Sequence, residues 1–207
     1  MQLTKGAIGN LINRYKAVLK KCHLMNTFGS LAVAGMLVMG GAGMAGAEEI
    51  TLDQDLQHSY IIKNGDSYTI NLNNFTLTGQ NVGEAILVED ATASIKNGTI
   101  KNGNSASAIS INNSTANIEN VNINTDKRSV NVIATESEKT AEAIFSNTNI
   151  TSKQEDAAVF IQAKAENATA KVTINNTSIS GDWYALSGNG TNTGGKTEIT
   201  INSGNLS

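Results

Sequence analysis

The side chains of this sequence that could perform acid–base or metal chemistry are carboxylates that occur in close pairs. The pairs are Asp53/Asp55, Glu89/Asp90, Glu136/Glu138 and Glu155/Asp156. Enzymes that cleave polysaccharides need several carboxylates on one face, often with Ca²⁺ or a basic residue beside them. The pairs here are spread along the chain, and the Gly-Gly-x-Gly-x-Asp repeat that binds Ca²⁺ is absent. We interpret them as solvated turn residues and predict no catalytic residue, metal site or cofactor.

Other reactive side chains are few. Cys22 is the only thiol, and Cys22 and His23 both lie within the first 47 residues. The remaining imidazole, His58, has no partner at catalytic spacing and is interpreted as a surface or cap residue. The aromatic pair Trp183-Tyr184 is expected to cap or fill the core. We therefore expect a protein that is not an enzyme.

The first 47 residues differ from the rest in charge. Residues 1–47 contain five Lys/Arg and no acid, whereas residues 48–207 contain ten Lys/Arg and eighteen Asp/Glu, a formal charge of −8. A basic segment (1–27) precedes an uncharged one (28–47), which ends in Ala45-Gly46-Ala47, the small-x-small pattern that signal peptidase accepts. The pattern predicts an extended, helical signal peptide cleaved after Ala47, with a retained membrane anchor as the alternative. The acidic remainder disfavours nucleic acid as a partner.

A repeated motif indicates the fold of the remainder. Two large apolar residues (Φ) flank an Asn in the pattern Φ-x-Asn-x-x-Φ, and the copies begin 23 to 29 residues apart. The first apolar residue and the Asn of the copies are Leu72/Asn74, Ile95/Asn97, Ile118/Asn120, Phe145/Asn147 and Ile174/Asn176, and a sixth copy has Ile201 with Ser203. A second apolar patch follows the first four copies after 14 residues, at Ile86, Ile109, Val132 and Val159. Short alternating segments with this period predict a β-solenoid.

Stacked coils would place equivalent residues of successive copies in columns, and these apolar columns would form a narrow core that no single coil could bury alone. Two explanations of the repeated Asn are open. Its amide could point inward and hydrogen-bond from coil to coil, or Asn could serve the left-handed backbone conformation of a turn. We predict an all-β protein with five to six coils over residues 69–207, preceded by an N-terminal capping segment over residues 48–68.

The leader and the repeats together resemble the N-terminal part of a bacterial autotransporter, a type V secretion protein of the adhesin group. The similarity rests on Ile12-Asn13-Arg14-Tyr15-Lys16-Ala17-Val18, which is similar to the extended signal-peptide region of that family, on the Ala-Gly-Ala sequence and on the Asn- and Thr-rich repeats. The family segment begins eleven residues late, which puts the true start codon in question. The resemblance implies a passenger that folds as a right-handed parallel β-helix and a C-terminal β-barrel in the outer membrane. These 207 residues contain no barrel, so we expect a chain truncated at its C-terminus.

The expected function is that of a non-enzymatic passenger segment, exported through the inner membrane and surface-exposed or secreted, which acts in adhesion or self-association. Many weak polar contacts along a rod would supply affinity through multivalency. Its expected partners are glycans or proteins of host or bacterial cell surfaces and further copies of the chain. Membrane contact is expected only through the signal peptide or a missing barrel. The alternatives are a fragment of a secreted β-helical polysaccharide-degrading enzyme and a truncated remnant without function.

Overall fold

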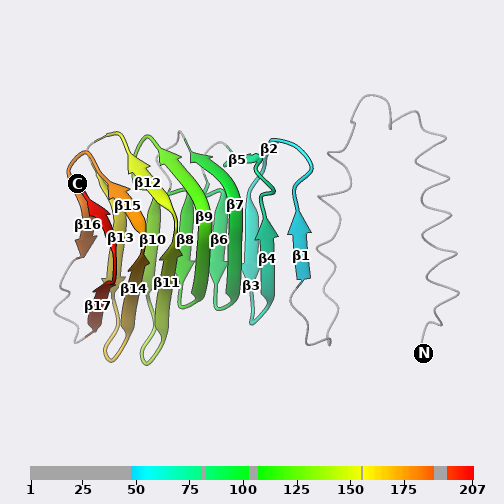
Figure 1. Ribbon diagram of the computed structural model, residues 1–207. Coiled ribbons are helices and arrows are strands. Elements are labelled where there is room, and N and C mark those ends of the chain that lie inside the picture. Colours follow the sequence, from blue (N-terminus) through cyan, green and yellow to red (C-terminus); the bar gives the residue numbers. More distant parts are fainter. Residues whose placement is uncertain (1–47, 81–82, 103–106, 155, 189–194) are drawn as a thin grey trace, which may run out of the picture. The chain divides into compact units, whose positions relative to one another are not determined.

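The computed structural model describes residues 48–80, 83–102, 107–154, 156–188 and 195–207. The predicted signal peptide, with Ala45 and Ala47 of its cleavage site, lies outside the described residues. The described part is all-β, and its strands stack as the parallel β-solenoid that the repeats predict (Figure 1). None of the described residues belongs to a helix long and apolar enough to cross a membrane.

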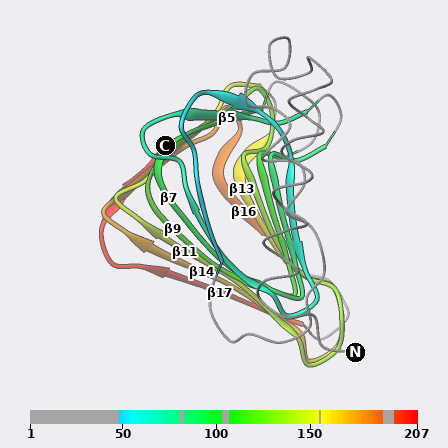
Figure 2. The same ribbon diagram turned by 90° about the vertical axis from the view of Figure 1, so that its right-hand side faces the viewer.

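Each coil passes through three faces, which surround the core when the stack is viewed along its length (Figure 2). The first face contains β1 (Glu48–Thr51), β4 (Ser67–Asn71), the first halves of β7 (Thr92–Asn102) and β9 (Thr115–Thr125), β11 (Thr140–Ser146), β14 (Thr169–Asn175) and β17 (Lys196–Ile201). The second face contains β2 (Leu56–Gln57), β5 (Thr76–Thr78), the second halves of β7 and β9, β12 (Asn149–Ser152), β15 (Thr177–Ser180) and β18 (Gly204–Leu206). The third face contains β3 (Tyr60–Lys63), β6 (Ile86–Glu89), β8 (Ile109–Asn112), β10 (Val130–Ala134), β13 (Ala157–Ala163) and β16 (Tyr184–Gly188).

The core consists of apolar columns that run from coil to coil. Alternation along each strand turns every second side chain inward, and parallel pairing in register aligns those side chains. On the first face the column is Ile50, Ile70, Ile95, Ile118, Phe145, Ile174 and Ile201. On the second face it is Leu56, Leu77, Ile100, Ile123, Ile150, Ile179 and Leu206. The chain has no proline, so every residue of these strands has an N–H to donate.

Two residues do not pair as the sequence spacing predicts: Leu72 in the column of the first face, and Val132 in the apolar patch that forms the third face. Ile70, not Leu72, pairs with Ile95, because the corner between β4 and β5 is two residues longer than the corner within β7. Leu72 is buried in this longer corner. It lies against Gly98 of the next coil, so closely that a Cβ added to Gly98 would be 2.5 Å from the Leu72 Cβ. On the third face Val130, not Val132, pairs with Ile109, because the connection that precedes β10 is two residues shorter.

The repeated Asn residues form the corner between the first and second faces. Asn74, Asn97, Asn120, Asn147 and Asn176 all have positive φ, between 45° and 67°. Asn tolerates this left-handed conformation better than other non-glycine residues, so the turn explanation holds. Their side chains are exposed or half-exposed rather than inward, yet some bond along the stack: Asn176 Nδ2 donates to Asn147 Oδ1 at 2.8 Å and Asn120 Nδ2 to Asn97 Oδ1 at 3.4 Å.

Residues 48–68 contain the strands of a complete coil, β1 to β3, which continue the pairing of all three faces. The backbone pairing of this coil is limited, since β2 is only two residues long. Two side-chain hydrogen bonds to the next coil supplement it. Asp55 Oδ1 accepts from the Thr76 N–H at 2.8 Å, and Asn73 Nδ2 donates to the Leu52 carbonyl at 3.1 Å. The predicted capping segment is therefore a rung of the stack with polar attachments to the next one.

Candidate functional site

A second corner with left-handed backbone joins the third face to the first, and it positions a polar hollow. Positive φ recurs there at Asn64, Asp90, Asn113, Glu138 and Asn167. Unlike the first corner, this one varies in residue type, so its outer surface changes from coil to coil. The sequence did not predict this corner, because its Asp and Glu residues could be interpreted only as solvated turn residues.

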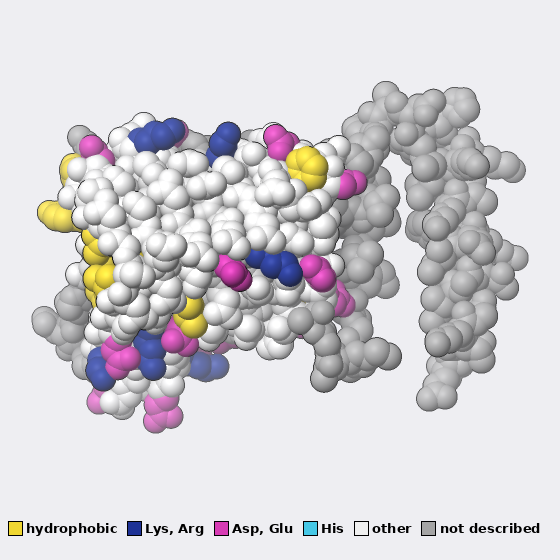
Figure 3. Space-filling view, viewed as in Figure 1, with side chains coloured by type: hydrophobic (Ala, Val, Ile, Leu, Met, Phe, Trp, Pro, Cys, Tyr) yellow, Lys and Arg dark blue, Asp and Glu magenta, His cyan; other side chains and the backbone are white. Residues whose placement is uncertain are grey.

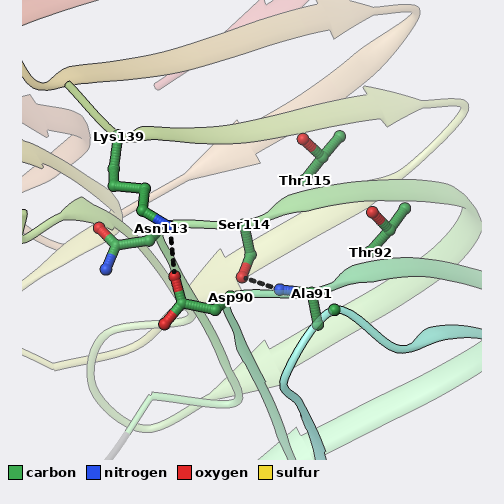
Figure 4. Close-up of a pocket in the computed structure, with 8 residues that line it drawn as sticks. Asp90, Ala91, Thr92, Asn113, Ser114, Thr115 and Lys139 are labelled. Atoms are coloured by element: carbon green, nitrogen blue, oxygen red, sulfur yellow. Dashed lines mark hydrogen bonds and ion pairs between the residues drawn. The ribbon is translucent and has the colours of Figure 1, made fainter. Parts of the chain in front are cut away.

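The hollow lies at this corner and measures about 280 Å³ (Figure 4). It is lined by Gly65, Asp90, Ala91, Thr92, Asn113, Ser114, Thr115 and Lys139. Lys139 comes from the turn before β11 and reaches back to Asp90, with Nζ 3.3 Å from Oδ1. The side chains of both are partly exposed, at 49% and 38%, so water weakens this ion pair.

Several polar atoms around the hollow have structural partners. The Ser114 hydroxyl accepts from the Ala91 N–H at 3.0 Å and donates to the Asn112 carbonyl at 2.7 Å. The Asn113 amide bonds the next coil, donating to Thr135 Oγ1 at 2.9 Å and accepting from the Thr135 N–H at 2.8 Å. What the hollow presents to a ligand is therefore one ammonium, one carboxylate and the two threonines. At its size, and with so few apolar walls, it fits a contact point for a small polar group rather than an enclosed ligand pocket.

Of the other carboxylates that the sequence singled out, Glu136 accepts a hydrogen bond from Asn113 Nδ2 at 3.3 Å beside the hollow, and Glu155 lies outside the described residues. Glu89 forms an ion pair with Lys63 at 2.7 Å, and Asp156 forms one with Arg128 at 3.0 Å. The Arg128 guanidinium also lies 4.3 Å from the centre of the Phe160 ring. Within the described residues, no three His, Cys, Asp or Glu side chains lie close enough to hold a metal ion. His58 packs edge-on against Tyr60 in the first coil, with ring centroids 4.7 Å apart.

The outer side of the second face carries two columns of small polar residues. One column is Thr76, Thr99, Asn122, Asn149, Ser178 and Asn205, and the other is Gln57, Thr78, Lys101, Asn124, Thr151 and Ser180. Lys101 is the only charged residue among them. Because the columns follow the strand pairing, hydroxyl and amide groups recur about every 4.8 Å along the stack. We call these two columns the polar face.

The C-terminal end of the stack is apolar (Figure 3). Among the described strands, β17, β18 and β16 are the last of the three faces, and each pairs with a described strand on one side alone. Five of the six exposed large hydrophobic residues of the described part belong to this end: Trp183, Tyr184, Ile199, Ile201 and Leu206. The aromatic pair expected in the core or its cap is thus 60% exposed in both of its members.

Comparison of the chain with protein-family models, with curated proteins and with solved structures finds no match. The site is therefore defined by geometry alone: a polar corner hollow, a polar face with repeated chemistry and an apolar end.

Proposed function

We propose that the chain is an exported, non-enzymatic binding module, a passenger segment of the autotransporter type that acts in adhesion or self-association at the cell surface or after secretion. The observation that supports adhesion is the polar face. It offers twelve regularly spaced outward positions, of which eleven carry a hydroxyl or amide group and one, Lys101, carries a charge.

A surface of this kind suits a ligand that is itself repetitive and uncharged, such as a cell-surface glycan. Each hydroxyl or amide group contributes little, since exposed hydrogen bonds exchange with those to water. Simultaneous contacts along several coils add up through effective concentration. The partly exposed hollow at the opposite corner would then be an accessory contact rather than a reaction centre.

Binding of the full chain to immobilised neutral polysaccharides and to cells tests the proposal. The variant Asn149→Arg places a long charged side chain in the middle of the polar face and should weaken binding about tenfold, as expected when several neighbouring contacts are lost. Thr173→Arg, an outward position of the first face, is the matched control and should bind like the parent. Equal binding by both variants would contradict the polar face as the binding surface. Release of reducing ends from the polysaccharide would instead support the enzyme alternative.

Export is tested separately. If the leader is a signal peptide, N-terminal sequencing of the exported protein should begin at Glu48, and Ala47→Asp should leave the precursor uncleaved. An exported chain that retains residues 1–47 would support the membrane-anchor alternative.

A further inference from the structure

The hollow between the third and first faces exists because the corner there changes length within the stack. Between paired strand residues this corner has two residues in two successive coils, 90–91 and 113–114, but eight in each of the next two, 134–141 and 163–170. The longer corners extend beyond the shorter ones at the lower edge of Figure 1. The first long corner therefore overhangs the short ones, and Lys139 reaches from it to Asp90.

Backbone hydrogen bonds hold the floor of the hollow in place. Asp90 donates its N–H to the Asn112 carbonyl at 3.1 Å, and its own carbonyl accepts from the Gly65 N–H at 2.6 Å. Thr115 is anchored in the same way, by an N–H bond to the Ala91 carbonyl at 3.2 Å. A floor fixed by such bonds loses little conformational freedom when a ligand binds to it.

Three kinds of side-chain group in the hollow can bond to a ligand. Asp90 has a carboxylate, Thr92 and Thr115 have hydroxyls that bond to no described residue, and Lys139 has the ammonium that contacts Asp90. Figure 4 shows the two threonines on one side of the ion pair. Because this ion pair is partly exposed and therefore weak, a ligand can displace Lys139 from the carboxylate.

The charges around the hollow favour a cationic ligand. Glu136 Oε1 accepts a hydrogen bond from Asn113, in the wall of the hollow, at 3.3 Å. Asp66 follows a lining residue in the chain, and Glu142 lies beside another in the strand register. None of these three carboxylates forms an ion pair with a described residue. Together with Asp90 they outnumber the single ammonium of the hollow, so the local potential attracts cations and repels anions.

We infer that the hollow binds the protonated amine of an amino sugar, whose ammonium takes the place of Lys139 at Asp90. An ammonium group donates hydrogen bonds in several directions, and the neighbouring sugar hydroxyls can bond to Thr92 and Thr115. The volume of about 280 Å³ is at the lower limit of ligand pockets and suits one sugar ring rather than a chain. The site lies apart from the polar face, so it goes beyond the adhesion proposed above and does not depend on it.

Calorimetric titration of the full chain with short oligosaccharides of glucosamine, and with their N-acetylated counterparts, tests the inference. In mildly acidic buffer the two sugars share a ring and differ in the amine, which is charged only in the first. The glucosamine form should bind, and N-acetylation should weaken binding at least about tenfold, because it removes the charge that pairs with Asp90. Absence of binding by the glucosamine form, or equal binding of the two forms, would overturn the inference.

A pair of carboxylate variants separates the hollow from general attraction to an acidic protein. Asp90→Asn should weaken glucosamine binding at least about fivefold. It should fold normally, because Asn already has the same left-handed backbone at Asn64 and Asn113 of the adjacent coils. Asp126→Asn, which removes the same charge at the corner after β9, is the matched control and should bind like the parent. Equal weakening in the two variants would assign the binding to diffuse charge and overturn the inference.

Substitution of Lys139 should have the opposite sign. Lys139→Met removes the ammonium that competes for Asp90, so glucosamine should bind about threefold more tightly, whereas Lys153→Met, an equal loss of charge at another corner, should change little. Weaker binding in Lys139→Met would show that the lysine recruits the ligand instead of competing with it, and would overturn the inference in favour of an acidic sugar.

The outcome is separable from that of the polar face. Asn149→Arg should bind glucosamine like the parent, and Asp90→Asn should bind neutral polysaccharides like the parent. Loss of neutral-polysaccharide binding with intact glucosamine binding would therefore contradict the polar face alone, and the reverse result would contradict the hollow alone.

Discussion

The middle of the stack and its C-terminal end are built from the same motif but differ in how they bury it. Ile95, Ile118 and Phe145 have a neighbour in the column on each side and are no more than 1% exposed. Ile201 ends the same column and is 51% exposed. The contribution of a motif copy to stability is therefore determined by the coils beside it, as expected when each repeat contacts only its neighbours.

Substitutions along this one column should produce the largest difference. Ile118→Asp buries a carboxylate between two coils and should remove more than about 4 kcal/mol of unfolding free energy, whereas Ile201→Asp should remove about 1 kcal/mol or less. Chemical denaturation followed by circular dichroism measures both, at a concentration where the chain is monomeric. Glu138→Lys, at an exposed turn, is the surface control and should behave like the parent. Equal losses for the two isoleucine variants would show that the columns are not the principal source of stability.

Substitutions at the Asn corner should affect the middle of the stack and its C-terminal end equally. The cost there comes from backbone strain at positive φ, which does not depend on a neighbouring coil on both sides. Replacing Asn120 in the middle, or Asn176 nearer the end, with Ala should cost about 1 kcal/mol at either position, since Ala tolerates positive φ less well. The glycine variants at the two positions should lie within a few tenths of a kcal/mol of the parent. Thermal unfolding of the four variants measures this. A much larger cost at Asn120 than at Asn176 would mean that packing, not φ, determines the effect.

The two ends of the molecule should respond weakly to opposite extremes of pH. Burial raises the pKa of Tyr60 in the first coil, and a hydrogen bond from Lys196 lowers the pKa of the Glu198 carboxyl in β17. A raised tyrosine pKa contributes stability that is present below its unfolded value of about 10 and is lost as pH rises through the folded value. A lowered glutamate pKa contributes stability that is present above its unfolded value and is lost as pH falls through the folded value.

Unfolding midpoints measured against pH, with Tyr60→Phe and Glu198→Gln as controls, test both responses. Tyr60→Phe should remove part of the alkaline loss and change little at neutral pH, because the Tyr60 hydroxyl is buried without a hydrogen-bond partner. The acid response should be the smaller, since Glu198 is solvated and its ion pair is screened. An alkaline loss that is identical in Tyr60→Phe would assign the titration to other groups.

The sequence predicted the fold class and most of the columns because period-two alternation and a fixed Φ-x-Asn-x-x-Φ spacing are local properties. It misplaced Leu72 and Val132 for one physical reason. Residues two apart on a strand point the same way, so a corner that is longer or shorter by two residues leaves the pattern intact while it shifts the register. The hollow at Asp90 was not predictable, because it depends on Lys139, which a turn two coils away along the chain brings back to it.

The strand register also limits how the gene for such a rod can change. Thr92 lies beside Thr115, so positions 23 residues apart are equivalent in consecutive coils. Deletion of residues 92–114 would join Ala91 to Thr115, shorten the rod by one rung and keep the paired columns continuous, although Val121 would then face Leu72 in the place of Gly98, where even a Cβ would lie 2.5 Å from the Leu72 Cβ. Deletion of a single residue within a strand would instead turn its inward side chains outward. The height of the stack can therefore change by inheritance only in whole coils, whereas the corners and connections between strands can differ in length, as they do among these coils.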